Sequence, residues 1–199
     1  MNPSLVGSEM CIRDSGYSDA WHQEATEQRG LENLRNTATA LPVLRRDDVK
    51  ELFQRQAVIS PVELESRYEV YSEQYTLAVE VEAKVALSIA RTQISPAVQK
   101  HLGSLARSIS QLQTVGLNPD QRTLQYTAEL QQRMQDQVNA LDDELLQLHH
   151  GDITASMNHA ANVLLPRLLQ LRDVVDALEG LVDDAVSYTH LRAHETRIH

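Results

Sequence analysis

The chain has 199 residues, of which 42% are hydrophobic but only 4% aromatic, and it carries a formal net charge of −10 at pH 7. This charge argues against binding to nucleic acid or to anionic membrane surfaces, because both need a basic face. Seven glycines and six prolines are few helix breakers for this length, so the composition favours an all-α fold.

Targeting and redox signals are weak. No apolar run approaches the roughly 20 residues that span a bilayer. The N-terminus also lacks the basic region and the continuous apolar core of a signal peptide. The single cysteine, Cys11, excludes an internal disulfide framework and fits a reducing compartment. We therefore expect a cytoplasmic protein.

The two ends, residues 1–15 and 187–199, share neither the composition nor the periodicity of the chain between them. Both resemble translations of sequencing-adaptor DNA, and we expect them to be artefacts. Cys11 and His190 then carry no information about native chemistry. His194-Glu195 with His199 is similar to a zinc motif, but the second histidine comes five residues after the first instead of four. That spacing takes the two imidazoles off one helical face, so we expect no metal site there.

A first short helix is predicted from Ser18 or Asp19 to about Arg29, with Gly30 as its left-handed C-cap. It carries Trp21, the only tryptophan, which we expect to anchor the helix on a neighbouring element and not to stack on a ligand.

The segment Leu31–Leu44 has no clear period and is predicted to be a connection. A second short helix is predicted from Asp47 or Asp48 to about Gln56, since two acids at its start favour the positive end of the helix dipole.

A long helix is predicted to begin after Ser60, where Ser60 and Glu63 have the spacing of a capping box and Pro61 fits the first helical position. Its apolar residues predict one wide stripe, made of Leu64, Tyr68, Tyr71, Tyr75, Ala78, Val79, Val81, Val85 and Ile89. Pro96 interrupts a pattern that resumes after it, so we expect a kink there and a helix that continues to about Val115.

Two more helices are predicted to follow. Gly116 ends the long helix, while Asn118 caps the next one and Pro119 takes its first position. That helix runs from Asp120 to about His149 with a heptad-like seam. Gly151-Asp152 reverses the chain, and a last helix, bent at Pro166, runs from about Ile153 to Ala185.

Short connections make these long helices antiparallel neighbours, so the predicted fold is an antiparallel three-helix bundle. Its first helix would be about 80 Å long at 1.5 Å per residue. Two partners of about 30 residues each cannot cover that length. We therefore expect its N-terminal half, with Tyr68, Tyr71 and Tyr75, to pack on something outside the bundle.

Between the two ends the sequence has no Gly-rich phosphate loop, no cysteine cluster and no nucleophile elbow. The candidates for chemistry are His149-His150 with Asp152 and His159, and the row Glu65, Glu69 and Glu73 with Arg67 and Arg91. We interpret the histidines as capping or solvated residues near helix ends. We interpret the row as a solvated face with intrahelical ion pairs. We predict no catalytic, cofactor-binding or metal-binding residue in this chain.

One stretch resembles a known family. The residues that match the region after the catalytic domain of type III glutamine synthetases are ELF (51–53), ELESRYEVY (63–71), VEAK (81–84) and an Ile-x-Pro-Ala turn (94–97). Upstream, Gly16–Leu44 resembles the segment that joins that family's catalytic domain to its helical tail. The resemblance covers roughly residues 16–186.

The resemblance implies a C-terminal fragment of an ATP-dependent glutamate–ammonia ligase. Residues 16–58 would be the end of the catalytic region and a linker, and 59–186 the helical bundle. ATP and the Mg or Mn ions would be held in the catalytic domain upstream, so the fragment alone is expected to be inactive. The implied partners are its own catalytic domain and neighbouring subunits of a homo-oligomer. The alternative is a stand-alone acidic helical bundle that acts as a scaffold or interaction module.

Overall fold

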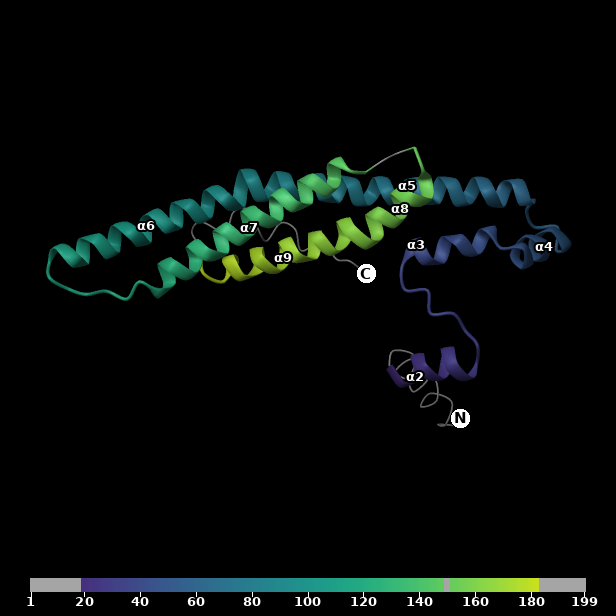
Figure 1. Cartoon of the computed structure of the whole chain (residues 1–199), viewed down its shortest axis with the longest axis horizontal. Helices are drawn as coiled ribbons and strands as arrows, with labels where there is room; N and C mark the ends of the chain where they lie inside the picture. The colour runs from purple at the N-terminus through teal and green to yellow at the C-terminus, as the bar shows by residue number, and fades with distance from the viewer. Residues whose placement is uncertain (1–18, 149–150, 183–199) are drawn as a thin grey trace, which may run out of the picture.

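A computed structural model describes residues 19–148 and 151–182, and every regular element within these ranges is a helix. Figure 1 shows a long rod with two shorter rods beside it and small helices at one end. The α-helices are α2 (Asp19–Gln23), α3 (Thr37–Ala40), α4 (Asp47–Arg55), α5 (Pro61–Ile89), α6 (Ser95–Thr114), α7 (Arg122–Leu146), α8 (Ile153–His159) and α9 (Leu165–Glu179). Within the described ranges no helix is long and apolar enough to cross a membrane.

The start of α5 has the predicted capping box. The Ser60 backbone N–H donates to the Glu63 carboxylate at 2.7 Å, and the Glu63 N–H donates to Ser60 Oγ at 3.3 Å. Pro61 occupies the first turn, where its missing N–H costs no helical hydrogen bond. This cap fixes the register of the longest element in the fold.

The long helix is confirmed as one kinked rod of 54 residues, formed by α5, a π-helical segment η3 (Ala90–Ile94) and α6. The last rod has the same plan, with the π-helical segment η4 (Ala160–Leu164) between α8 and α9. In both rods a proline, Pro96 or Pro166, is the second residue after the π segment. The wider π turn gives room for a proline ring, which would otherwise clash with the carbonyl four residues before it.

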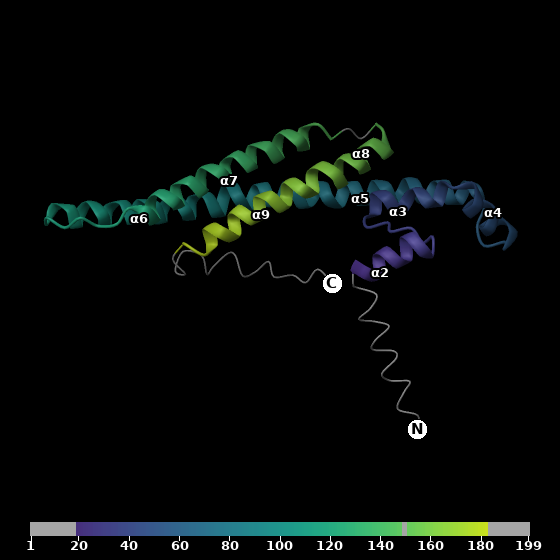
Figure 2. The same cartoon turned by 60° about the horizontal axis from the view of Figure 1, so that its bottom comes forward.

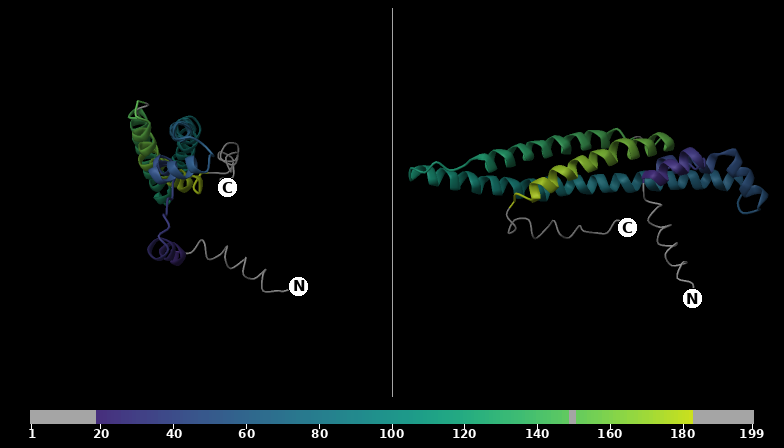
Figure 3. Two further views of the ribbon diagram at one scale, coloured as in Figure 1. Left: turned by 90° about the vertical axis from the view of Figure 1, so that its right-hand side faces the viewer. Right: turned by 90° about the horizontal axis from the view of Figure 1, so that it is seen from below.

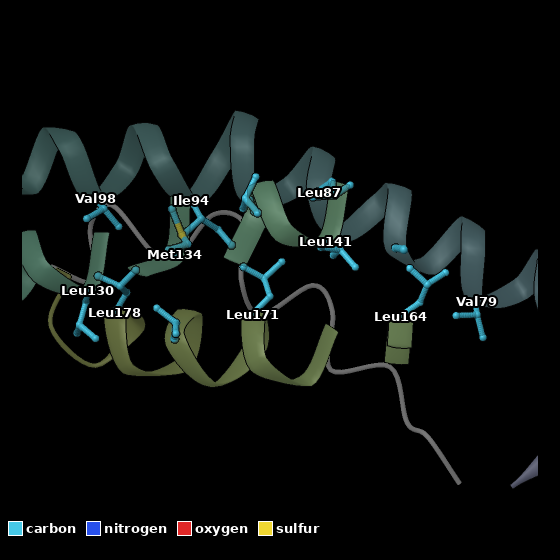
Figure 4. Packing of buried hydrophobic residues seen from close by; sticks show 14 of the residues in the cluster. Val79, Leu87, Ile94, Val98, Leu130, Met134, Leu141, Leu164, Leu171 and Leu178 are labelled. Atoms are coloured by element: carbon cyan, nitrogen blue, oxygen red, sulfur yellow. The ribbon is translucent and has the colours of Figure 1, made fainter. Parts of the chain in front are cut away.

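The three rods enclose one apolar core, as predicted for a three-helix bundle. Figure 4 shows the core side chains of α5 to α6, α7 and α8 to α9 pointing toward one another. Met134, Leu141 and Leu164 are fully buried at its centre. Burying an aliphatic side chain of this size contributes about 1.5–3 kcal/mol, so this core is the main source of stability.

The predicted single stripe on α5 is wrong. Leu64, Tyr68 and Val79 are buried, whereas Tyr71, Val81 and Val85 remain 45–58% exposed. The apolar residues of α5 therefore form an inner face and an outer face, because they are spread too widely around the helix for one bundle to cover.

The N-terminal half of α5 is also not left without cover. Tyr68 packs with Ala38, Met157 and Ala161 in a second small core, against which Leu41 and Leu44 also lie. The segment predicted as a plain connection supplies this cover, as α3 and a 3-10 turn η2 (Leu41–Arg45) beside α5 (Figure 2). α3 begins at Asn36, whose side chain accepts the Thr39 N–H at 2.8 Å. Residues of the chain itself therefore cover part of the surface of α5 that we expected an external partner to cover.

At the other end of the rod, α6 and the start of α7 extend past the end of α9 (Figure 3). Gly116, at φ +83°, ends α6 as predicted, and the Leu117 N–H donates to the Leu112 carbonyl at 3.1 Å. The predicted cap at Asn118 is wrong, because α7 begins only at Arg122. Asp120 holds the turn instead by accepting the Arg122 N–H at 2.9 Å.

The remaining boundaries are close to the prediction. α2 continues as a π segment η1 (Glu24–Gln28), and Gly30, at φ +64°, closes it. α4 agrees with its predicted bounds, whereas α7 ends before His149. α8 starts at Ile153 with Asp152 as its N-cap. The ends that we expect to be adaptor-derived lie outside the described residues, as do the last residues of the predicted final helix.

Candidate functional site

The acidic row on α5 does not form the intrahelical ion pairs that we predicted. Glu65 lies 3.0 Å from Arg45 Nε of η2 and 4.0 Å from Lys50 Nζ of α4. It therefore ties two preceding elements to α5. Glu69 and Glu73 have no salt bridge with any described residue, so the row does not converge on a common point.

Arg91, the more distant base that we considered with the row, belongs to another contact. Its guanidinium pairs with Asp142 of α7 across the bundle. The i, i+4 pair that does form on α5 joins Lys84 to Glu80. Each of these contacts joins or supports helices, and none arranges acids around a shared ligand.

Tyr68 is the residue that joins most elements in the small core. Its hydroxyl lies 2.8 Å from Thr154 Oγ1 of α8, and the Arg45 guanidinium lies over its ring at 4.7 Å from the centroid. Tyr75 is half-buried, and burial, followed by the charge of Glu82, raises the pKa of its phenol. A tyrosine with a raised pKa stays protonated at neutral pH, so it is no general base. The tyrosines act as packing and hydrogen-bonding residues.

The histidine candidates do not come together in the part of the chain that the structure describes. His149 and His150 lie outside it. His159 Nε2 lies 3.0 Å from the backbone oxygen of Glu144 and 3.8 Å from its carboxylate, so it ties α8 to the end of α7. Asp152 is turned to the start of α8, where it accepts the Ala155 N–H at 3.0 Å.

Trp21 lies at the edge of the fold, on α2. The Arg29 guanidinium stacks on its ring at 4.8 Å from the centroid, so a base of the same segment covers the indole. Figures 1 and 3 place α2 apart from the three rods. The predicted role of Trp21 as an anchor on a neighbouring element stays a prediction.

Two cavities that described residues line show no group of converging acids. The space between α5 and α8 holds about 100 Å³ and is lined by Glu73, Thr76, Leu77, Ile153 and Ser156. Ligand pockets usually hold about 300–1,000 Å³. A wider cleft of about 450 Å³ beside α2 is lined by His22, Gln23, Thr26, Asn33 and Arg35. None of these residues is a carboxylate, the charged oxygen ligand typical of sites for hard divalent cations.

ATP with Mg or Mn therefore does not fit the described residues. No group of three or more His, Cys, Asp or Glu side chains there could hold a metal ion. Phosphoryl transfer also needs several bases or backbone donors around the phosphates. Arg45, Arg91 and Arg29 are instead engaged with Glu65, Asp142 and Trp21 at separate places in the fold. The side chains described above pack against one another and form contacts between helices.

Comparisons with known proteins give a consistent result. The sequence model of the glutamine synthetase C-terminal domain matches residues 9–113, which include part of the first end segment. A type-3 glutamine synthetase of Dictyostelium discoideum is 27% identical over 179 residues, which cover 85% of this chain and 24% of that protein. A glutamine synthetase of Bacteroides fragilis (strain YCH46) is 24% identical over 198 residues, 94% of this chain and 27% of that protein. The chain thus spans about a quarter of the length of these relatives.

Proposed function

The chain belongs to the glutamine synthetase C-terminal domain family, and from this premise we propose that it is the helical C-terminal portion of a longer glutamate–ammonia ligase of type III. The observation that carries the proposal is the extent of the match. The family model matches residues 9–113, which include the irregular segment before α5, and the Dictyostelium discoideum enzyme matches 85% of this chain with 24% of its own length. A generic helical bundle has no reason to reproduce that segment.

In this proposal the chemistry takes place outside these helices. The ligase phosphorylates the glutamate carboxylate with ATP, and ammonia then displaces the phosphate. Carboxylates that hold divalent metals and bases that neutralise the phosphoryl group are needed for this step. We assign them, with ATP and Mg or Mn, to the catalytic domain that precedes this portion. We assign no residue of this chain to them.

The role of the chain itself would be to extend the surface of the ligase. We propose that 16–58 forms the end of the catalytic region and a linker, and that 59–186 forms the appended bundle. Its partners are its own catalytic domain and neighbouring subunits of a homo-oligomer in the cytoplasm. The exposed apolar side chains on α5 and on the turn after α6 support such a role, because surfaces of this kind mark interaction sites.

The test is to sequence the DNA upstream of the source reading frame. We expect several hundred in-frame codons that encode a domain with the metal- and ATP-binding glutamates of the family. An unrelated upstream domain, or a stop codon directly before the matched region, would contradict the proposal. Either result would favour a stand-alone helical scaffold.

A further inference from the structure

The outer face of α5 is apolar and about half-exposed, and Leu77 at its edge also borders the space between α5 and α8. Val70, Leu77, Val81 and Val85 are 43–58% exposed. Their spacing of seven, four and four residues places them on one side of the helix, opposite the buried Val79, Ala83 and Leu87. A helix that is apolar on two opposite sides is normally covered on both. We call these four residues, with the neighbouring Tyr71, the outer face.

The surroundings of the outer face are acidic. Glu69 and Glu73 lie along its edge and form no salt bridge with a described residue. Over its whole length α5 has six glutamates against two bases, Arg67 and Lys84. A partner that docks here therefore needs apolar side chains and an excess of positive charge.

The opposite end of the molecule has these properties. We call residues 99–129 the arm, since they follow Val98 on α6 and precede Leu130 on α7, two buried residues of the main core that Figure 4 labels. Leu102 of the arm still packs against this core. Four exposed apolar residues gather toward the tip of the arm, namely Leu112, Val115, Leu117 and Tyr126.

The charge of the arm is opposite to that of α5. The α6 helix has Lys100 and Arg107 and no acid, although the whole chain carries a net charge of −10. On the rest of the arm Arg122 pairs with Asp120, and Glu129 is the remaining acid. Neither Lys100 nor Arg107 forms a salt bridge within the described ranges.

We propose that the arm of one copy docks on the outer face of α5 in a second copy. The two surfaces match in apolar character and are opposite in charge. Pairing two outer faces would instead bring together two copies of α5, each with six glutamates against two bases, which is unfavourable. The contact is therefore heterologous. Each copy keeps one free arm and one free outer face, so the contact closes into a ring or extends into a filament.

This contact rests on the proposed function, because it names the two surfaces through which copies of the proposed homo-oligomer would associate. Its test uses only the 199-residue chain in solution. The chain can therefore fail to associate while the assignment to a ligase holds, and it can associate while that assignment fails. The measurement is analytical ultracentrifugation of the wild-type chain and of two double variants. Leu77→Asp with Val81→Asp disables the outer face, and Leu117→Asp with Tyr126→Asp disables the arm.

The wild-type chain is expected to form dimers or larger species that dissociate as salt is raised, because screening weakens charge attraction. Each double variant alone is expected to be a monomer. An equimolar mixture of the two should form a species of twice the monomer mass and none larger, because only one intact arm and one intact outer face remain to pair. The matched control is Val62→Asp with Leu146→Asp. These residues are 79% and 78% exposed outside both surfaces, so the control should associate as the wild type does.

The proposal fails if the wild-type chain stays monomeric at about 0.5 mM, where even weak complexes are populated. It also fails if the mixture of the double variants stays monomeric while circular dichroism shows both to be folded. For a variant that does not fold, Lys100→Glu with Arg107→Glu replaces the arm variant, and Glu69→Lys with Glu73→Lys replaces the outer-face variant. A chain that carries both charge reversals is expected to associate again, because its arm and its outer face are then once more opposite in charge.

Discussion

Single residues at helix ends decide where the elements of this fold begin. At α5 the Ser60 hydroxyl accepts the Glu63 N–H, and the Glu63 carboxylate accepts the Ser60 N–H in return. This reciprocal pair was predictable because Ser, Pro and Glu have the standard spacing. The cap of α3 by Asn36 and Thr39 was not, because a helix of four residues is too short to show a period.

Replacing the cap residue tests its contribution. Ser60→Ala is expected to lower the free energy of unfolding by about 1 kcal/mol, since it leaves the Glu63 N–H without its side-chain acceptor. The measurement is urea denaturation followed by circular dichroism. Ser66→Ala, at an exposed position within the same helix, is the control and should leave stability unchanged or slightly higher. Equal stability losses in the two variants would show that the cap is not the cause.

The same cap predicts a pH dependence. Hydrogen bonds from the Ser60 backbone N–H and hydroxyl lower the pKa of Glu63 below its ordinary value. A lowered folded-state pKa means that this contribution is complete above the ordinary glutamate pKa and is lost as pH falls through the folded pKa. Glu63→Gln has no such titration, so its stability deficit relative to the wild type should shrink between pH 7 and about pH 3. A deficit that stays constant over this range would contradict the account.

At the scale of elements, the two long rods share a proline placed just after a π segment. The sequence predicts bends at Pro96 and Pro166, because an internal proline removes a hydrogen bond and crowds the preceding turn. It does not predict the π turns, since a period of 3.6 and a locally wider turn fit the same short apolar pattern. It also does not separate the two apolar faces of α5, because which residues are covered depends on how many helices pack around the rod.

Pro96→Ala is expected to raise the free energy of unfolding by about 1–2 kcal/mol. An internal proline costs about 3 kcal/mol in a helix. The loss of proline rigidity in the unfolded chain offsets about 1 kcal/mol of the gain. The measurement is again urea denaturation. Pro119→Ala, in the turn before α7, is the control and is expected to be neutral or slightly destabilising. A lower stability for Pro96→Ala would mean that the π turn and its proline are needed for packing between the rods.

At the scale of the whole molecule, the number and order of the long helices followed from hydrophobic periodicity and from the turn residues Gly116 and Gly151-Asp152. The cover over Tyr68 did not, because it joins residues far apart in sequence, such as Ala38 and Met157. The candidate side chains were identifiable by type and spacing. Their actual partners were not, since Glu65 meets Arg45 and Arg91 meets Asp142 only through tertiary packing.

We propose that the reactive centre of the ligase lies outside this chain, in the catalytic domain that precedes it. The most direct test is to incubate the purified chain with glutamate, ammonia, ATP and Mg²⁺ or Mn²⁺ and to measure glutamine. We predict no glutamine above the enzyme-free blank, because no group of three or more His, Cys, Asp or Glu side chains among the described residues could hold a metal ion. Glutamine formation that rises in proportion to the concentration of the chain would contradict this account.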